Sequence, residues 1–250
     1  MSAPAIRISG RLHTGPKQHI ADFDITLPSR CWSVLLGPSG VGKTSLLRLI
    51  AGLPCAANLV GKITAADGAP IASHRVAMMA QDDQLLPWAS ALDNTTICTR
   101  LRGENAQKER ATTLLAQVGL SGLEHRKPAQ LSAGQRQRVA LARTLYEDRD
   151  IILLDEPFSA LDVTTRQSVQ DLAVRLLARR TVVLISHDPA EAIRLADAAW
   201  LITPAGITSC ALPSTTIPRN AAAKETLGAH AALLNHMRVL FAGETPRCGA

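Results

Sequence analysis

The chain has 250 residues, of which 46% are hydrophobic and 19% charged, with a formal net charge of +6. This composition suits a globular protein with a substantial core, and no stretch approaches the roughly 18–20 uninterrupted apolar residues of a membrane-spanning helix. The N-terminal segment lacks the charged-then-apolar order of a secretory signal, so we expect a cytosolic protein.

Cysteine usage and charge exclude further classes. The five cysteines are scattered, odd in number and never spaced as C-x-x-C, which argues against a zinc site and against a disulfide framework. The basic residues are dispersed, and only three Phe, one Tyr and three Trp are available to stack on bases. We therefore interpret the net charge as a solvated surface and expect no nucleic-acid partner.

The predicted elements begin with a strand, a turn and a second strand between residues 20 and 36. Apolar and polar side chains alternate from 23 to 27, and a later apolar run leads into a glycine-rich loop. The segment 44–51 predicts a helix, which Gly52 and Pro54 end.

The middle of the chain, from about 85 to 145, has no comparable strand. The segments 106–118 and 133–146 predict helices, so we expect a mostly helical insertion into an α/β core. The chain shows no internal repeat and has no room for a second full domain.

Two short apolar runs rich in β-branched residues follow, at 151–154 and 181–185. Strands that are buried on both faces of a parallel sheet have this composition. Val169, Leu172 and Leu176 lie between them at helical spacing, which predicts a strand–helix–strand unit. Beyond residue 203 prolines interrupt the pattern, and the last part, 221–240, predicts one or two helices.

The glycine-rich loop matches the phosphate-binding pattern G-x-x-x-x-G-K-[ST] and lies between a predicted strand and a predicted helix. Glycines allow successive backbone N–H groups to turn toward phosphate oxygens, and the helix that follows points its positive end at them. Lys43 supplies a cation for the β- and γ-phosphates, and the Thr44 hydroxyl is a Mg²⁺ ligand. The predicted nucleotide contacts are Gly37, Pro38, Ser39, Gly40, Val41, Gly42, Lys43, Thr44 and Ser45. The loop alone does not distinguish kinases, GTPases and ATPases.

Two carboxylates, Asp155 and Glu156, follow the apolar run 151–154, at the strand end where ligands gather in open α/β sheets. Asp155 is placed to hold Mg²⁺ through a bound water, and Glu156 is placed to polarise the water that attacks the γ-phosphate. The alternative is a strand-end carboxylate followed by a helix-cap acid, since Pro157 comes next. The neighbouring phosphate loop favours the hydrolytic role.

With these features the chain resembles the ATP-binding cassette (ABC) ATPases over about residues 5–205. The segment 131–138, Leu-Ser-Ala-Gly-Gln-Arg-Gln-Arg, is similar to the family signature LSGGQ-x-R. Gln81 lies in a Met-Ala-Gln-Asp glutamine loop, 159–162 is similar to the D-loop, and His187 follows Ile-Ser. Each motif alone is weak, whereas the set in the family's order is specific.

The resemblance implies an α/β fold, with a P-loop NTPase (RecA-like) core, an antiparallel β subdomain and a helical signature subdomain. The implied ABC ATPase domain covers 1–205, with the helical insertion at about 85–145, and 206–250 forms a C-terminal helical extension.

The signature also has a physical logic of its own. Ser132 and Gly134 open a predicted helix, so a hydroxyl and free N–H groups form a second anion site, unless the segment is merely a helix N-cap. The family forms head-to-tail dimers with two ATP molecules between the subunits, so we expect a homodimer or a pair with a close relative. The resemblance implies ATP and Mg²⁺ as cofactors. The residues carried over from the family are Gln81, Glu156 and His187 for catalysis, Thr44, Gln81 and Asp155 for Mg²⁺, and Ser132, Gly134, Gln135 and Asp162 for nucleotide.

Two departures from the family are visible. Ala133 replaces the second signature glycine and adds a methyl group near the expected phosphate. The family usually places an aromatic ring before the phosphate loop to stack on adenine, and residues 12–14 contain none, with His13 the side chain nearest to that role.

The run 81–88, followed by Ala-Leu-Asp-Asn, resembles the nitrate, sulfonate and taurine importer ATPases, whose relatives also carry pyrimidine precursors of thiamine. We expect Leu85, Leu86 and Trp88 to line a groove for a helix of a membrane subunit, with ordinary core packing as the alternative. The resemblance implies the ATP-hydrolysing subunit of a bacterial importer, which is cytoplasmic and peripheral on the inner face of the cell membrane. Its partners would be an integral membrane permease and, indirectly, a periplasmic solute-binding protein.

Two other classes of nucleotide-binding protein fit the sequence less well. A cassette ATPase acting on nucleic acid or the ribosome typically carries long coiled coils, zinc cysteines or two cassettes, and this sequence has none of them. A P-loop kinase or GTPase leaves the signature and His187 unexplained, and no N-K-x-D guanine motif is visible.

Overall fold

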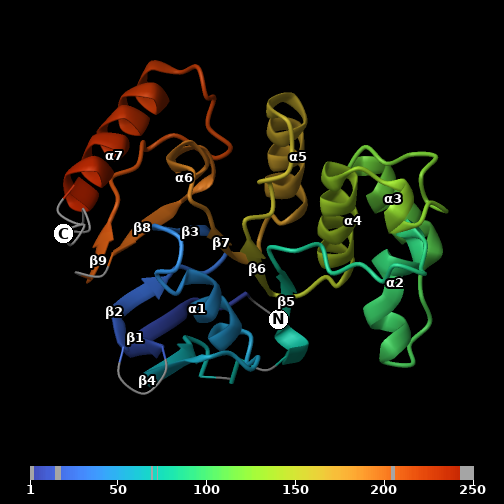
Figure 1. Ribbon diagram of the computed structural model, residues 1–250, viewed down its shortest axis with the longest axis horizontal. Coiled ribbons are helices and arrows are strands. Elements are labelled where there is room, and N and C mark those ends of the chain that lie inside the picture. The colour runs from blue at the N-terminus through green and yellow to red at the C-terminus, as the bar shows by residue number, and fades with distance from the viewer. Residues whose placement is uncertain (1–2, 15–17, 69, 72, 204–205, 243–250) are drawn as a thin grey trace, which may run out of the picture.

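The fold was obtained as a computed structural model, which describes residues 3–14, 18–68, 70–71, 73–203 and 206–242. The described residues form one six-stranded sheet and one three-stranded sheet with helices around them (Figure 1). The strands are β1 Ile6–Thr14, β2 Gln18–Leu27, β3 Trp32–Leu36, β4 Ala57–Ala65, β5 Val76–Met79, β6 Ile151–Asp155, β7 Thr181–Ile185, β8 Ala198–Thr203 and β9 Gly206–Ser209. The helices are α1 Lys43–Ile50, α2 Ala91–Leu101, α3 Lys108–Gln117, α4 Ala133–Tyr146, α5 Val163–Leu176, α6 Pro189–Leu195 and α7 Lys224–Ala242.

The larger sheet has the order β5-β6-β7-β3-β8-β9. Its strands pair in parallel from β5 to β8, and β9 is added antiparallel at the edge. The two apolar runs form β6 and β7, so the strand–helix–strand prediction is confirmed. Every residue of both strands is buried, because helices or the second sheet cover both faces.

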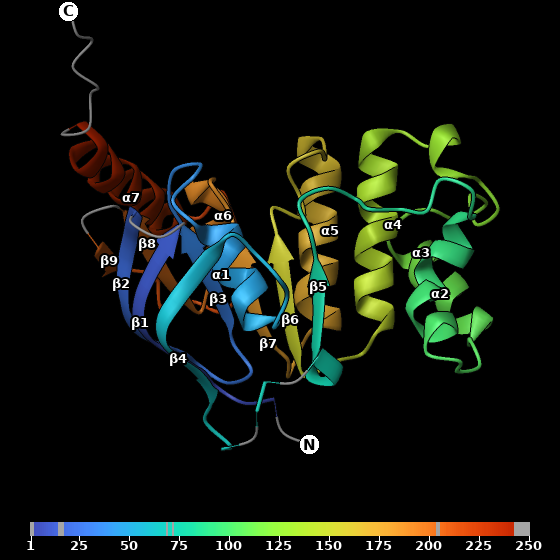
Figure 2. The ribbon, with the colours of Figure 1, turned by 60° about the horizontal axis from the view of Figure 1, so that its bottom comes forward.

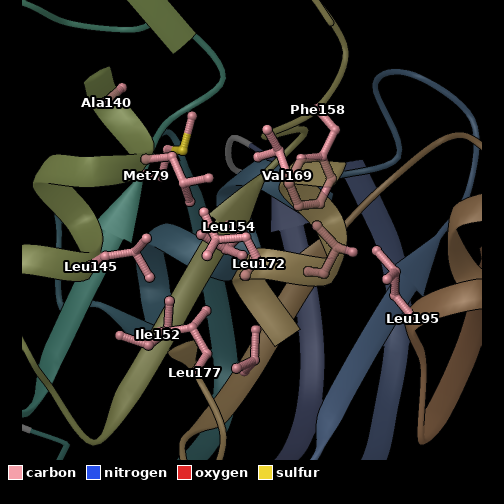
Figure 3. Close-up of a cluster of buried hydrophobic side chains, with 14 of the residues drawn as sticks. Met79, Ala140, Leu145, Ile152, Leu154, Phe158, Val169, Leu172, Leu177 and Leu195 are labelled. Carbon is pink, nitrogen blue, oxygen red and sulfur yellow. The ribbon is translucent and has the colours of Figure 1, made fainter. Parts of the chain in front are cut away.

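Alternate residues of the central strands supply two separate cores. In β6, Ile152 and Leu154 join a cluster with α4 and α5, whereas Ile151 and Leu153 join α1 and the smaller sheet. Figure 3 shows Leu154 between Met79 on one side and Leu172 of α5 on the other. The period-2 geometry of a strand therefore explains why an uninterrupted apolar run is needed here.

The smaller sheet has the order β2-β1-β4, and all its pairs are antiparallel. The predicted antiparallel β subdomain is thus confirmed. Gly10 of β1 lies opposite Gly61 of β4, and a Cβ atom on Gly10 would stand 2.4 Å from the Val60 carbonyl oxygen. Only glycine permits this close approach of the two backbones.

Helices α2, α3 and α4 lie together at the end of the molecule away from the smaller sheet, as Figures 1 and 2 show. The predicted helices at 106–118 and 133–146 are present as α3 and α4, and α2 was not predicted. The start of α2 is held by Asn94, which is fully buried. Its amide donates to the carbonyl oxygens of Leu86, Ala89 and Ser90 and accepts from the Leu86 N–H.

Among the described residues after 205, β9 belongs to the large sheet, and α7 is the one helix that follows it. The domain boundaries themselves stay a prediction. Arg219 holds this part of the chain against α6, because its guanidinium donates to the carbonyl oxygens of Ile193 and Ala196. The C-terminus of a helix is a favourable place for a cation. Within the described ranges, every helix is too short or too polar to cross a membrane.

Candidate functional site

The phosphate loop follows β3 at the carboxyl edge of the large sheet. Gly37 has φ 154°, and a Cβ there would lie 2.5 Å from the Ile202 carbonyl oxygen, so the close packing against β8 excludes any other residue. Gly42, with φ 85°, is the N-cap of α1 and provides no side chain to cap it. The first N–H groups of α1 are therefore available to an anion.

Lys43 closes over this loop. Its side chain is buried, and the Nζ atom donates to the carbonyl oxygens of Gly37 (2.7 Å) and Pro38 (2.8 Å). Burial lowers the pKa of Lys43, and the charges of Glu156 and Asp155 act in the opposite direction. The ammonium group is thus already placed at the loop before any phosphate binds.

Asp155, at the end of β6, is 1% exposed, and neither carboxylate oxygen has a hydrogen-bond partner of ordinary geometry. Burial raises the pKa of Asp155, and the charge of Glu156 raises it further. The nearby Thr44 hydroxyl and the Lys43 charge lower it. A buried carboxylate without a partner is unfavourable. Oxygen ligands of this kind fit Mg²⁺, so the predicted metal ligands Asp155 and Thr44 are suited to that ion.

Glu156 has an unusual backbone. Its φ is 48°, a left-handed conformation that costs a non-glycine residue about 1–3 kcal/mol unless the surroundings hold it. Its N–H donates to the Ile185 carbonyl oxygen of β7 at 3.1 Å. The side chain turns toward His187, whose Nδ1 atom lies 3.0 Å from Glu156 Oε1. The structure therefore brings two of the predicted catalytic side chains together.

His187 itself stands on a turn that a buried carboxylate supports. The Ser186 hydroxyl donates to Glu191 at 2.6 Å and accepts from the Asp188 N–H at 3.0 Å. Glu191 is buried, which raises its pKa. Sequence reasoning missed Glu191, although its place one turn into the helix after His187 was a signal that a carboxylate faces the loop.

The signature segment opens α4 as predicted. Ser132 is the N-cap: its Oγ accepts from the Gln135 N–H at 3.2 Å, and Gln135 Oε1 accepts from the Ser132 N–H at 2.8 Å. This capping box satisfies both polar groups within the chain. Ser132 and Ala133 are exposed. In Figures 1 and 2, α4 is separated from α1 by β5 and β6, so the start of α4 is not part of the phosphate loop's own surroundings.

The remaining predicted residues lie at element ends. Gln81 is exposed just after β5. Asp162 is the N-cap of α5 and accepts from the Thr165 N–H at 3.0 Å and the Thr164 hydroxyl at 2.9 Å, so these hydrogen bonds hold its pKa far below the usual range. Its contact with nucleotide stays a prediction. His13 lies in β1 opposite Asn58 of β4.

Two arginines of α4 were missed by the sequence. The Arg136 Nε atom lies 2.8 Å from the Asp83 carboxylate, and Arg143 donates to the carbonyl oxygens of Asp83 and Gln84. They fasten the segment after Gln81 to the signature helix. No sequence pattern signalled this role, since arginine side chains on a helix surface usually have no fixed partner.

A phosphate loop on a parallel sheet, a buried unpartnered carboxylate and an adjacent carboxylate–histidine pair define a nucleotide hydrolase. A family model described as ABC transporter matches residues 20–159. The chain belongs to this family; it binds nucleotide and is an ATPase. The recognition of the family from its motifs is confirmed, as is the P-loop fold with an antiparallel β subdomain.

Curated relatives are transporter subunits. The aliphatic sulfonates import ATP-binding protein SsuB 1 of Rhodococcus jostii is 48% identical over 189 residues, which are 75% of this chain and 74% of that protein. The taurine import ATP-binding protein TauB of Pseudomonas fluorescens is 44% identical over 206 residues, or 79% and 76% of the two chains. They support an importer ATPase, and not a cassette ATPase that acts on nucleic acid or the ribosome.

A solved structure has the same fold: the dimeric post-hydrolysis state of the ATP-binding cassette MJ0796 bound to ADP and Pi. It aligns with a TM-score of 0.72 and 23% identity, over 84% of this chain and all of that one.

Proposed function

We propose that this chain powers the uptake of a small organic anion, an aliphatic sulfonate or taurine, through a membrane permease. The names of the two curated relatives support this substrate class, and nitrate and pyrimidine precursors of thiamine are the other cargoes that the sequence suggested. The observation that carries the hydrolytic part is the buried, unpartnered carboxylate of Asp155 beside the phosphate loop.

In the proposed site, Gly37 to Ser45 hold the phosphates of ATP, with Lys43 on the β- and γ-phosphates. Thr44, Asp155 and Gln81 would hold Mg²⁺, Asp155 through a water molecule. When bound, the ion would supply positive charge that offsets the charge of the phosphates. Lys43 leaves the carbonyl oxygens of Gly37 and Pro38 for the phosphate, which is a stronger acceptor because it is charged.

The water-activating group in this proposal is Glu156. Its carboxylate accepts the proton of a water that attacks the γ-phosphate, a contribution of about 10²–10⁴-fold for a well-placed base. His187 holds the Glu156 carboxylate at 3.0 Å in the free chain, and it contacts the γ-phosphate oxygen where charge develops.

The nucleotide site is completed by a second subunit. Ser132, Gly134 and Gln135 of one chain would cap the γ-phosphate held by the loop of the other, in a homodimer or a pair with a close relative. Support comes from the exposure of Ser132 and from its position on a helix start, where anions are favoured. Asp162 would lie at the same junction.

The permease would dock beside α2 and α4. Trp88 is 71% exposed, unusual for so large an apolar side chain, whereas Leu85 is buried in the core and lines no surface. Leu85 therefore shows the alternative, core packing, Leu86 is half-buried, and we assign the docking role to Trp88. A hollow of about 420 Å³ lies between β5, α2 and α4 and includes Cys98 and Arg143, but Trp88 does not line it. With this docking, the chain would act in the cytoplasm, on the inner face of the cell membrane.

The test is reconstitution in liposomes with a sulfonate-type importer permease and its periplasmic binding protein. Taurine, an alkyl sulfonate, nitrate and a thiamine pyrimidine precursor are compared for stimulation of ATP hydrolysis. We expect the sulfonate class alone to stimulate, and stimulation by nitrate alone would reject the proposed cargo. Trp88→Ala should uncouple hydrolysis from the permease, while Val60→Ala, at an exposed apolar residue of β4 in the smaller sheet, is the control.

Lys43→Ala tests nucleotide binding directly. We expect Mg-ATP affinity to fall about 10–100-fold, because a charge-assisted contact to phosphate is lost. Lys62→Ala, an exposed lysine of β4, is the control and should bind normally. Unchanged affinity of Lys43→Ala would remove the phosphate loop from the proposal.

A further inference from the structure

Gln137, on α4, is a buried polar side chain that the proposed mechanism has not used. It is 5% exposed, and both ends of its amide are engaged. The Nε2 group donates to the Glu156 carbonyl oxygen at 3.1 Å and to the Ser159 hydroxyl at 3.3 Å, and Oε1 accepts from the Ala160 N–H at 3.0 Å. The side-chain hydrogen bonds of Gln137 therefore all go to the segment 156–160.

The backbone of this segment has a conformation that other groups must stabilise. Glu156 has a left-handed backbone, which persists only where the surroundings hold it. Its N–H is fixed by the Ile185 carbonyl oxygen of β7, and its own carbonyl oxygen accepts from Gln137 and from both the N–H and the hydroxyl of Ser159. With both sides of the residue held, the direction in which its carboxylate leaves the backbone is set. Without Gln137, the carbonyl side would lose its link to α4.

A second contact joins the same two parts. A Cβ atom on Gly134 would lie 3.1 Å from the Ala160 carbonyl oxygen, so the first turn of α4 packs directly on the backbone that Gln137 holds. Ser132 and Gly134, which face the partner's nucleotide in the proposed dimer, thus belong to one rigid unit with Gln137. A shift of the start of α4 would move the Glu156 backbone with it.

We propose that Gln137 is a positioning residue for ATP hydrolysis, which fixes the Glu156 backbone and links it to the signature end of α4. The proposal rests on the proposed function, since it takes Glu156 as the water-activating group. Its consequence is that the phosphate seen by one subunit's signature segment adjusts that same subunit's hydrolytic carboxylate, so the two nucleotide sites of a dimer are coupled through this amide.

The test compares two variants with one control in the full-length protein. Gln137→Leu removes the amide at similar volume. Gln137→Glu keeps the shape and still accepts from the Ala160 N–H, but it cannot donate to the Glu156 carbonyl oxygen. Thr144→Val is the control, because Thr144 is also buried on α4 and its hydroxyl donates only to the Ala140 carbonyl oxygen.

We expect both Gln137 variants to lower kcat about 10–100-fold, as a misplacement near 1 Å does, with KM and Mg-ATP affinity unchanged. Thr144→Val should retain the wild-type kcat. A purely structural role predicts a different pattern, in which Tm, nucleotide affinity and kcat fall together. That pattern, or a wild-type kcat in Gln137→Glu, would overturn the proposal. If Gln137→Leu fails to fold, the isosteric Gln137→Glu decides.

A double variant separates this proposal from the one on which it rests. In a Glu156→Gln background, adding Gln137→Glu should lower the residual rate no further, because both changes act through the same carboxylate. A further 10-fold loss there contradicts the positioning role. If Glu156→Gln alone leaves turnover unchanged, the proposed function fails; if it abolishes turnover while the Gln137 variants remain fully active, only the positioning role fails.

Discussion

The two proposed phosphate sites, around the phosphate loop and at the start of the signature helix, differ in burial and in how far their polar groups already have partners. Around the phosphate loop, Lys43 and Asp155 are buried, and the Asp155 carboxylate accepts no hydrogen bond of ordinary geometry. At the start of α4, Ser132 is exposed, and the capping box with Gln135 already satisfies it. The first region carries an unfavourable charge that a cation would relieve. In the second region, the polar groups of Ser132 and Gln135 are already hydrogen-bonded in the isolated chain, and we expect a binding role only when a phosphate from another chain approaches.

The contrast indicates which region must rearrange when nucleotide binds. The phosphate loop is preorganised, so little rearrangement opposes the first contact with ATP. In the proposed dimer, the signature segment would exchange the hydrogen bonds of its capping box for bonds to a partner's phosphate. We therefore expect substitutions at the strand end to remove chemistry or first binding, and those at the start of α4 to affect assembly of the pair.

The largest expected effect is that of Glu156→Gln. Turnover should fall about 10²–10⁴-fold, because the amide cannot accept the proton of the attacking water. Mg-ATP affinity should be retained, and an ATP-bound dimer should accumulate in size-exclusion chromatography. Glu109→Gln, on the exposed face of α3, is the control. Phosphate release at the wild-type rate would take Glu156 out of the mechanism.

A mixture of two inactive subunits tests whether the two regions act across a dimer. Lys43→Ala removes one chain's phosphate loop, and Ser132→Arg blocks the other chain's signature segment. In the mixed dimer one site combines both defects and the other combines two intact halves. We expect at most half of the wild-type rate from the isolated mixed dimer, measured as phosphate release, against almost none from either variant alone. Two fully active sites would disprove the shared-site arrangement.

Asp155→Asn tests the charge at the strand end. The folded-state pKa of Asp155 is raised above its ordinary value, so the folded state holds this proton to higher pH than the unfolded state does. Stability is therefore lost as pH rises from the ordinary carboxyl range through the folded pKa. Without Mg²⁺, the variant should be about 1–3 kcal/mol more stable than the wild type at neutral pH, which raises Tm by a few degrees.

The same variant should hydrolyse ATP far more slowly, and the stabilisation should vanish in acid, where the wild-type carboxyl is neutral. Calorimetry across this pH range checks both parts. Asp24→Asn, an exposed carboxylate of β2, is the control and should show neither effect. A lower Tm for Asp155→Asn at neutral pH would mean that its charge has a partner after all.

The smallest effects belong to the helix caps. Ser132→Ala should cost about 0.5–2 kcal/mol of stability through loss of the cap on α4. Ser90→Ala removes an equivalent cap on α2, where the Ser90 hydroxyl accepts from the Asp93 N–H, and should cost a similar amount. Only Ser132→Ala should also weaken ATP-driven dimerisation, measured by light scattering. Equal dimerisation of the two variants would leave Ser132 a helix cap alone.

Much of the site followed from short-range patterns. The loop from Gly37 to Thr44, the pair after β6 and the capping box at Ser132 depend on neighbours within a few positions, and such local geometry is encoded locally. Strand β4 escaped prediction because its middle is exposed on both faces and lacks a clear period. Helix α2 escaped because its buried face is built from Asn94, Thr95 and Thr99, polar residues that no apolar period reveals.

The sequence by itself determined the class of fold, the phosphate loop and the identity of the acidic pair, since apolar runs, glycines and motif order are properties of neighbouring residues. The tertiary structure decided which distant groups meet: Glu156 with His187, Gln137 with the Glu156 backbone, and Arg136 with Asp83. It also decided that Asp155 is buried beside Thr44, Lys43 and Glu156. Such pairings arise from how strands and helices pack across the core, and one-dimensional spacing does not contain them.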